Sequence, residues 1–134
     1  NLHFVVGLLG APDETAYFAG RHENDVDIHG VLLMRYKDVI CQCTGAKDTW
    51  CENNVQIMGD QGYIRVTPTS NQLKDVCLVQ KGGETQSVHL EEDQWFYEVQ
   101  ELARLVQEED YETCYKNLKN TLEVVRILEK CRNA

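Results

Sequence analysis

The sequence has 134 residues, 43% of them hydrophobic and 26% charged, a balance typical of one soluble globular domain with its own core. No apolar run approaches the ~18 residues of a membrane-spanning helix, so we expect no membrane partner. The formal net charge of −9, from 22 acidic and 13 basic residues, repels a phosphate backbone, which excludes nucleic acid as an expected partner.

The first ten residues predict a helix. Apolar residues recur with helical spacing from Leu2 to Leu9, and Gly10 followed by Pro12 is a typical helix end. The chain begins at Asn1 without an initiator Met or a targeting segment, so we expect this helix to be the end of a linking helix that starts further upstream.

The region from residue 14 to residue 90 has the period-two alternation and the turn residues of a sheet. A strand over residues 26–36 is expected to pair with residues 39–43 as an antiparallel hairpin through Lys37 and Asp38. Gly82 and Gly83 indicate another hairpin turn, and such short connections make the sheet mostly antiparallel. The other expected strands span residues 55–58, 63–67, 76–79 and 86–90, with a weaker one over residues 15–18.

After Leu90 the apolar spacing becomes helical and predicts two amphipathic helices. Strands followed by helices predict an α+β domain over residues 1–134, with an open, mostly antiparallel sheet of six or seven strands, helices packed on one face and the other face free for dimerisation. The apolar faces of the helices are expected at Phe96, Val99, Leu102, Ala103 and Val106, and at Tyr115, Leu118, Leu122, Val125 and Leu128.

The cysteines lie among ordinary core patterns, and a domain of this size does not need disulfides. We interpret them as reduced thiols of a cytoplasmic protein. A zinc site is the alternative, but Cys41-x-Cys43 lacks the gap of a zinc knuckle and no second pair completes a tetrahedral set, so no metal is expected. The six are Cys41, Cys43, Cys51, Cys77, Cys114 and Cys131.

Motifs that would carry chemistry by themselves are missing from the sequence. It has no G-x-G-x-x-G loop, P-loop, G-x-S-x-G or H-E-x-x-H, and no evident Ser, His and Asp set. We therefore expect the isolated domain to bind no dinucleotide and to be inactive as a catalyst.

One turn and its surroundings carry a resemblance that covers nearly the whole chain. Gly59-Asp60-Gln61-Gly62 lies between two predicted strands, where the glycines allow a tight reversal. With a helix ending Leu8-Leu9-Gly10 and a later helix that begins Phe96-Tyr97-Glu98, the sequence resembles the C-terminal domain of the Gfo/Idh/MocA (glucose-fructose oxidoreductase and inositol dehydrogenase) family of oxidoreductases.

The resemblance implies a preceding Rossmann domain that holds NAD or NADP together with a catalytic Lys. It also implies a catalytic Asp and His pair just upstream of Asn1. In that case this domain would bind a sugar, a polyol or a related hydroxyl compound together with the Rossmann domain, and would make the contacts of a homodimer or a higher homo-oligomer.

The resemblance places His3 where many members have an Asp that holds substrate hydroxyls. His3 is therefore our candidate substrate-binding residue, and an exposed or half-buried His without such a role is the alternative. His29 and His89 are expected to face away from the helices as structural residues. Trp50 and Trp95 suit either a sugar pocket or a core or interface position.

The odd positions of the long strand, Asp27, His29, Val31, Leu33 and Arg35, are expected opposite the helices. A mixed apolar and polar sheet face suits a two-fold, sheet-on-sheet dimer, which the resemblance also implies; a solvated face is the alternative. The predicted interface residues are Val31, Leu33, Arg35, Met58, Tyr63 and Arg65.

Two alternative functions belong to other classes than an oxidoreductase domain. A stand-alone, non-catalytic dimerising or binding module is compatible with composition and periodicity. A thiol enzyme that uses Cys41, Cys43 or Cys51 would need a base or a helix N-terminus near the thiol, and the sequence offers no such partner.

Overall fold

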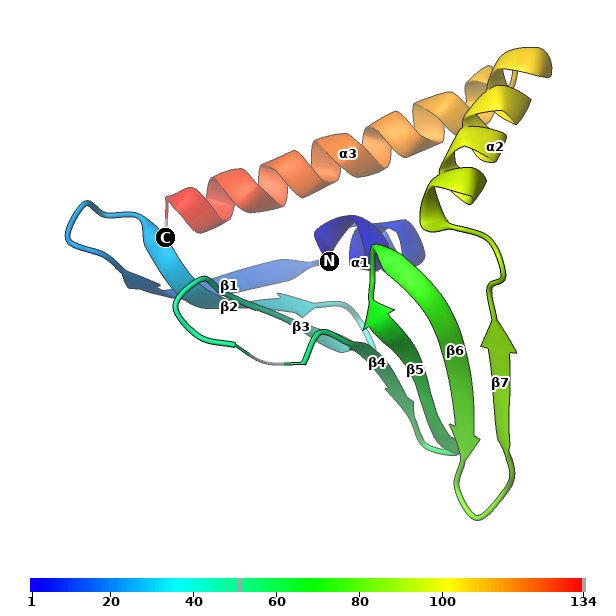
Figure 1. The fold of residues 1–134 in the computed structure, drawn as a ribbon. Helices are drawn as coiled ribbons and strands as arrows, with labels where there is room; N and C mark the ends of the chain where they lie inside the picture. Colours follow the sequence, from blue (N-terminus) through cyan, green and yellow to red (C-terminus); the bar gives the residue numbers. More distant parts are fainter. Residues whose placement is uncertain (51, 134) are drawn as a thin grey trace. The chain divides into compact units, whose positions relative to one another are not determined.

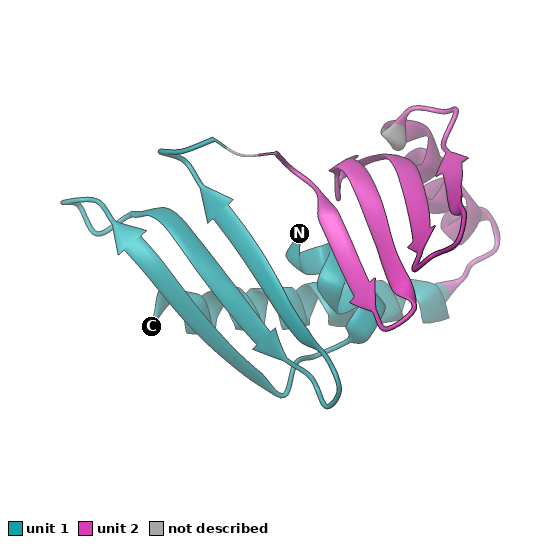
Figure 2. Ribbon diagram, turned by 90° about the horizontal axis from the view of Figure 1, so that it is seen from below, with its two compact units in different colours: residues 1–50, 111–134 teal, residues 51–110 magenta. Residues whose placement is uncertain are grey.

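The structure is a computed structural model that describes residues 1–50 and 52–133. The chain divides into two compact units, shown in different colours in Figure 2: Asn1–Trp50 with Tyr111–Ala134, and Cys51–Asp110. We call them unit 1 and unit 2 and describe each by itself. No helix among the described residues has the length and hydropathy needed to cross a membrane.

Unit 1 is a three-stranded antiparallel sheet with two helices on one face (Figure 1). The strands lie in the order β1-β2-β3, and α1 and α3 pack on them. Gly10 ends α1 with φ 78°, and its N–H donates to the Val6 carbonyl, as the Gly10 signal predicts. The elements are α1 (Leu2–Leu9), β1 (Glu14–Arg21), β2 (Asp27–Arg35), β3 (Ile40–Ala46) and α3 (Tyr111–Arg132).

The core of unit 1 forms where even positions of β2 meet the helices. Leu32 and Met34 are buried against side chains from both helices, which confirms the expected inward face of this strand. Cross-strand neighbours on the same face complete the layer, since Leu32 pairs with Tyr17 and with Cys43. The buried cluster is Val6, Leu32, Met34, Val124, Ile127 and Cys131.

A β-bulge changes the alternation at one end of β2. Gly20 pairs with His29, but the next residue of β1, Arg21, pairs with Asp27, so Ile28 is an extra residue in the ladder. The prediction that Asp27 shares a face with His29 is therefore wrong. Asp27 instead accepts a hydrogen bond from Tyr17, whose ring packs against the helix-side core.

Unit 2 is a four-stranded antiparallel sheet in the order β4-β5-β6-β7, with α2 in contact with β6. Val66 and Leu105 are its buried apolar residues among those described. Asp93 caps α2, because its side chain accepts a hydrogen bond from the Trp95 N–H. The elements are β4 (Val55–Gly59), β5 (Gly62–Thr69), β6 (Gln72–Gln80), β7 (Thr85–His89) and α2 (Gln94–Gln107).

The Gly59 to Gly62 segment is the hairpin that the sequence predicts. Gly59 pairs with Gly62, which leaves Asp60 and Gln61 as a two-residue turn between β4 and β5. Gly62 has φ 151°, and a Cβ there would lie 2.1 Å from the Val79 carbonyl oxygen, so this position requires glycine.

The α+β class and all seven strands are confirmed, but the expected single sheet is not shown. The strands form one sheet of three and one of four. The predicted hairpins have tight turns, whereas residues 47–54 separate β3 from β4. A connection of that length does not fix the next strand beside the previous one, so the alternation could predict the strands without predicting how they are grouped.

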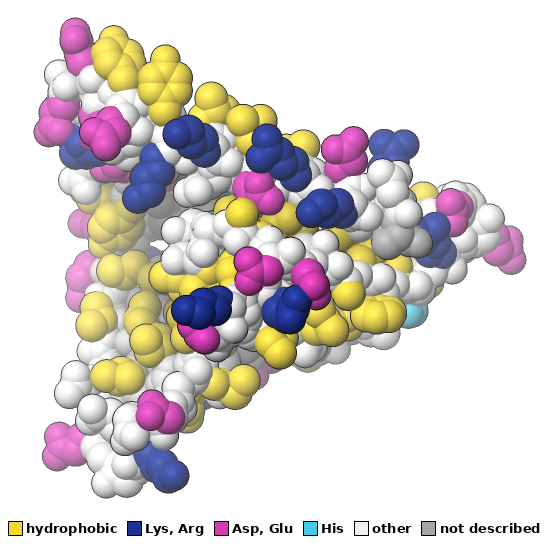
Figure 3. Space-filling view, turned by 180° about the vertical axis from the view of Figure 1, so that it is seen from behind, with side chains coloured by type: hydrophobic (Ala, Val, Ile, Leu, Met, Phe, Trp, Pro, Cys, Tyr) yellow, Lys and Arg dark blue, Asp and Glu magenta, His cyan; other side chains and the backbone are white. Residues whose placement is uncertain are grey.

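The buried faces predicted for the two closing helices are also wrong. In α3 the buried residues are Val124, Ile127 and Cys131, whereas the predicted stripe from Tyr115 to Leu128 is exposed. In α2 Leu105 is buried and most of the predicted stripe is exposed. Figure 3 shows apolar and basic side chains together at the surface along α3, across the top of the view. α3 carries two apolar stripes, and helical periodicity alone does not show which of the two is buried.

Candidate ligand pocket

Unit 1 contains a pocket of about 740 Å³, a size typical of small-molecule sites. It is lined by the first residues of α1, the β1–β2 hairpin, the end of β3 with the residues that follow it, and the C-terminal end of α3. The residues that line the pocket include Asn1, Leu2, Tyr17, Arg21, Asn24, Asp25, Asp27, Gly30, Cys43, Gly45, Lys47, Leu128, Cys131 and Arg132.

Two glycines lie in the floor of the pocket. Gly30 and Gly45 are cross-strand partners in β2 and β3, two pairs along the ladder from Leu32 and Cys43, so they lie on the helix side of the sheet. The Tyr17 ring lies against Gly30, where a Cβ would come within 2.5 Å of the Tyr17 hydroxyl. A Cβ at Gly45 would meet no atom within 4 Å. The Tyr17 ring therefore fills the space above Gly30, and the core layer ends in a hollow at Gly45.

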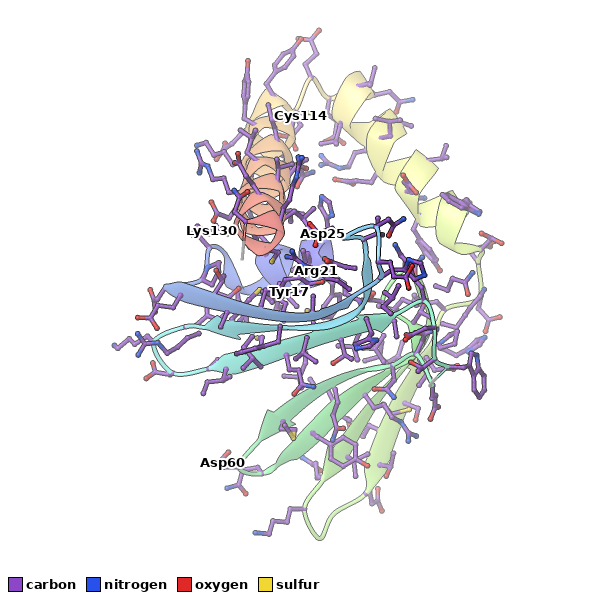
Figure 4. The ribbon with its side chains drawn as sticks, turned by 90° about the vertical axis from the view of Figure 1, so that its left-hand side faces the viewer. Tyr17, Arg21, Asp25, Asp60, Cys114 and Lys130 are labelled. Atoms are coloured by element: carbon purple, nitrogen blue, oxygen red, sulfur yellow. The ribbon has the colours of Figure 1, made fainter. Side chains whose placement is uncertain are left out.

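The Asp27 carboxylate contacts two neighbouring side chains of one pocket wall. Asp27 accepts a hydrogen bond of 2.9 Å from the Tyr17 hydroxyl and pairs with the Arg21 Nε at 3.4 Å. Arg21 also donates to Asp25, at 3.1 Å. Figure 4 shows Tyr17, Arg21 and Asp25 together on the side of β1 that faces α3. The Arg21 guanidinium is thus held between two carboxylates, which retain lone pairs for further donors.

The Tyr17 hydroxyl is a hydrogen-bond donor at neutral pH. Burial raises its pKa above the ordinary value, and the hydrogen bond to Asp27 and the negative charge of that carboxylate raise it further. Because Tyr17 donates its single phenol proton to Asp27, the Tyr17 oxygen and the Asp27 carboxylate are acceptors for a ligand hydroxyl, and the side-chain amide of Asn24 is the donor on this wall.

We expect Tyr17→Phe to lower the free energy of unfolding by about 1–2 kcal/mol, because it removes a hydrogen bond to a charged acceptor. Chemical denaturation monitored by circular dichroism measures this change. Tyr115→Phe is the matched control, since Tyr115 is exposed and makes no hydrogen bond in the described part of the chain. Equal effects of the two substitutions would contradict the importance of the Tyr17–Asp27 bond.

The thiols at the pocket are not activated. Burial raises the pKa of Cys43 and of Cys131, and the Asp27 carboxylate raises that of Cys131 further. Burial also raises the pKa of Cys41. A nucleophilic thiol needs a lowered pKa, so the structure argues against a thiol enzyme at Cys41 or Cys43. Cys51, the third candidate, lies outside the described residues.

Alkylation with iodoacetamide at pH 7.4 is expected to modify Cys114 first and Cys131 much more slowly. Cys114 is exposed, whereas Cys131 is buried and its raised pKa reduces the thiolate fraction. Mass spectrometry of timed samples gives the rate at each site, and in urea the rates should converge. Fast labelling of Cys131 in the folded protein would mean that its thiol is accessible and readily ionised.

The predicted site residues lie mostly away from this pocket. His3 is exposed on α1, next to the pocket residue Leu2, and its substrate role stays a prediction. His29 and His89 pair with Asp48 and Asp75, at 2.9 and 2.6 Å. Neither these histidines nor the exposed Trp50 and Trp95 line the pocket.

The predicted interface residues divide between the two units. In unit 1, Val31 and Leu33 are half-buried on the face opposite α1 and α3, and Arg35 on that face forms an ion pair with Glu14. In unit 2, Met58 and Tyr63 are cross-strand partners, and Met58 is highly exposed. Arg65 is exposed on β5.

Sequence reasoning missed the pocket wall. Tyr17 lies on the strand with the weakest alternation, and the bulge reverses the expected direction of Asp27. Arg21 and Asp25 do not belong to a recognisable motif, although the sequence does show that these two opposite charges lie four residues apart. The usable signal was Gly30 within an otherwise apolar strand, which often indicates that something approaches the backbone closely.

Comparison of the sequence with protein-family models and with curated proteins found no match. Within residues 1–50 and 52–133, no group of three or more His, Cys, Asp or Glu side chains is placed to hold a metal ion.

Proposed function

We propose that this chain is the substrate-binding and oligomerisation domain of an NAD(P)-dependent oxidoreductase that acts on a sugar, a polyol or a related hydroxyl compound. The observation that supports this most is that Asn1 and Leu2, at the start of α1, line the pocket of unit 1. The family resemblance puts the catalytic Asp and His pair immediately before these residues. The pocket is thus where a substrate within reach of that pair would bind.

The chemistry of the pocket suits a hydroxyl compound. A ligand hydroxyl both donates and accepts, and Tyr17, Asp27 and Asn24 provide complementary groups on one wall. The apolar side chains of Leu2 and Leu128 can cover the C–H surface of the ligand. In this proposal the domain binds and orients the substrate, and the groups that transfer hydride and proton belong to the rest of the enzyme.

The positions of the glycines support a dinucleotide site outside this chain. Gly10, Gly62 and Gly82, the glycines with positive φ, lie after a helix and at hairpin turns, and not in a loop that leads from a strand into a helix N-terminus. This arrangement differs from the glycine-rich loop that cradles a pyrophosphate, and in this proposal NAD or NADP is held by a separate Rossmann domain.

Cofactor binding by the product of the complete coding sequence tests this proposal. Calorimetry should detect binding of NAD(H) or NADP(H) to that product and no binding to the 134-residue chain. Tight dinucleotide binding by the 134-residue chain would contradict the assignment. A complete product that binds neither dinucleotide would favour the alternative of a non-catalytic module.

A further inference from the structure

The pocket of unit 1 contains cations that no carboxylate of the described chain neutralises. Its charged lining residues are Arg21, Asp25, Asp27, Lys47 and Arg132. Arg21 is paired with both Asp25 and Asp27. Lys47 and Arg132 form no ion pair within residues 1–50 and 52–133. Most Lys and Arg side chains of the described residues form no ion pair, and what distinguishes Lys47 and Arg132 is that both line the same pocket.

The two unpaired cations come from different parts of the fold. Lys47 directly follows β3, and Arg132 is the last residue of α3. The sequence separates them by 85 positions (132 − 47), and the fold brings both to the lining of one pocket. A single exposed Lys or Arg is common on any surface, whereas two at one cavity create a locally positive site.

The wall with Tyr17 has a different character. It carries the Tyr17 hydroxyl, the Asp27 carboxylate and the Asn24 side chain, with Arg21 already neutralised by its two carboxylates. Such a wall suits neutral hydroxyl groups, which need both donors and acceptors. One cavity therefore combines hydroxyl-binding groups with unpaired cations.

We infer that the pocket binds a hydroxylated compound with an anionic group, the anion at Lys47 and Arg132 and the hydroxyls at Tyr17, Asp27 and Asn24. A guanidinium binds a carboxylate or a phosphate through two parallel hydrogen bonds, and an ammonium adds a compact charge. A neutral sugar would leave both cations unused. The inference rests on the proposed function for its biological role, because it narrows the class of substrate of that same site.

Three probes that differ at one carbon test the inference: D-glucose, D-glucuronate and D-glucose 6-phosphate. Each is titrated into the ¹⁵N-labelled 134-residue chain at low salt, and the amide shifts of Gly30 and Gly45 report binding at the pocket floor. We expect at least one anionic probe to bind about tenfold more tightly than glucose, the effect of a charged hydrogen bond at a partly exposed site. Added NaCl should weaken the anionic probe and leave glucose unchanged.

Variants identify the cations responsible. Lys47→Gln together with Arg132→Gln should abolish the preference for the anionic probe and keep the affinity for glucose. Lys81→Gln is the matched control, because Lys81 lies in the β6–β7 turn of unit 2, outside the pocket. Thermal melts establish that each variant is folded.

The relative affinities of the two anionic probes distinguish a carboxylate site from a phosphate site, and either supports the inference. Equal binding of all three probes, or a double variant that keeps the preference, would overturn the inference and leave the proposed function standing. Failure of all three to bind the folded chain at millimolar concentration would overturn the inference and remove the pocket from the proposed function as well.

Discussion

Met34→Ala is expected to lower the free energy of unfolding of unit 1 by about 2–5 kcal/mol, the range for deleting a large apolar side chain from a packed core. Met34 is 0% exposed and lies among Val6, Leu32 and Ile127, under both helices of unit 1. Removal of its thioether chain leaves a cavity that side chains from strand and helix border. Urea denaturation followed by circular dichroism measures the loss.

The chain provides its own control, since it contains two methionines. Met58 is 81% exposed on β4, so Met58→Ala removes the same atoms from a position that is already in water. We expect that change to stay within about 0.5 kcal/mol of the wild type, as for most surface substitutions. Similar losses for both variants would mean that the core of unit 1 is not built around Met34.

The sequence predicted the elements of this fold well, because their signals are local. The Gly10 helix end, the Lys37-Asp38 turn and the Gly59 to Gly62 hairpin each depend on backbone preferences of a few adjacent residues. The inward direction of Leu32 and Met34 followed from period-two alternation, which holds along a regular strand.

The grouping of these elements could not be predicted in the same way. Whether β3 and β4 belong to one sheet depends on the course of residues 47–54, a connection too long for a tight hairpin turn. Which stripe of α3 packs inward depends on the partner surface, and the Val124 and Ile127 stripe is no more apolar than the Leu118 and Leu122 stripe. The pocket wall requires the Ile28 bulge, which alternation alone does not reveal.

Within the proposed dimer interface, the face of unit 1 opposite its helices is the part that carries large exposed apolar side chains. On this face Leu33 pairs with Ala16 on one side and with Gln42 on the other. Phe18 and Ile40, in the neighbouring rows, are 63% and 75% exposed. Large aromatic and aliphatic side chains that remain in water on a sheet face are typical of surfaces that become covered by a partner.

Leu33→Glu is therefore expected to convert a homodimer into a monomer, and in the isolated 134-residue chain the effect should be almost complete at micromolar concentration. The half-buried Leu33 lies in the middle row of that face, so in a sheet-on-sheet dimer its replacement would bury two unpaired carboxylates about the two-fold axis. Sedimentation velocity gives the mass of each species, and circular dichroism should show that the core around Met34 remains folded. Leu118→Glu is the control, because Leu118 is exposed on α3 and should leave the dimer intact. Dissociation by both variants would place the interface on the helices, and a wild-type chain that stays monomeric at high micromolar concentration would exclude this interface in the isolated domain.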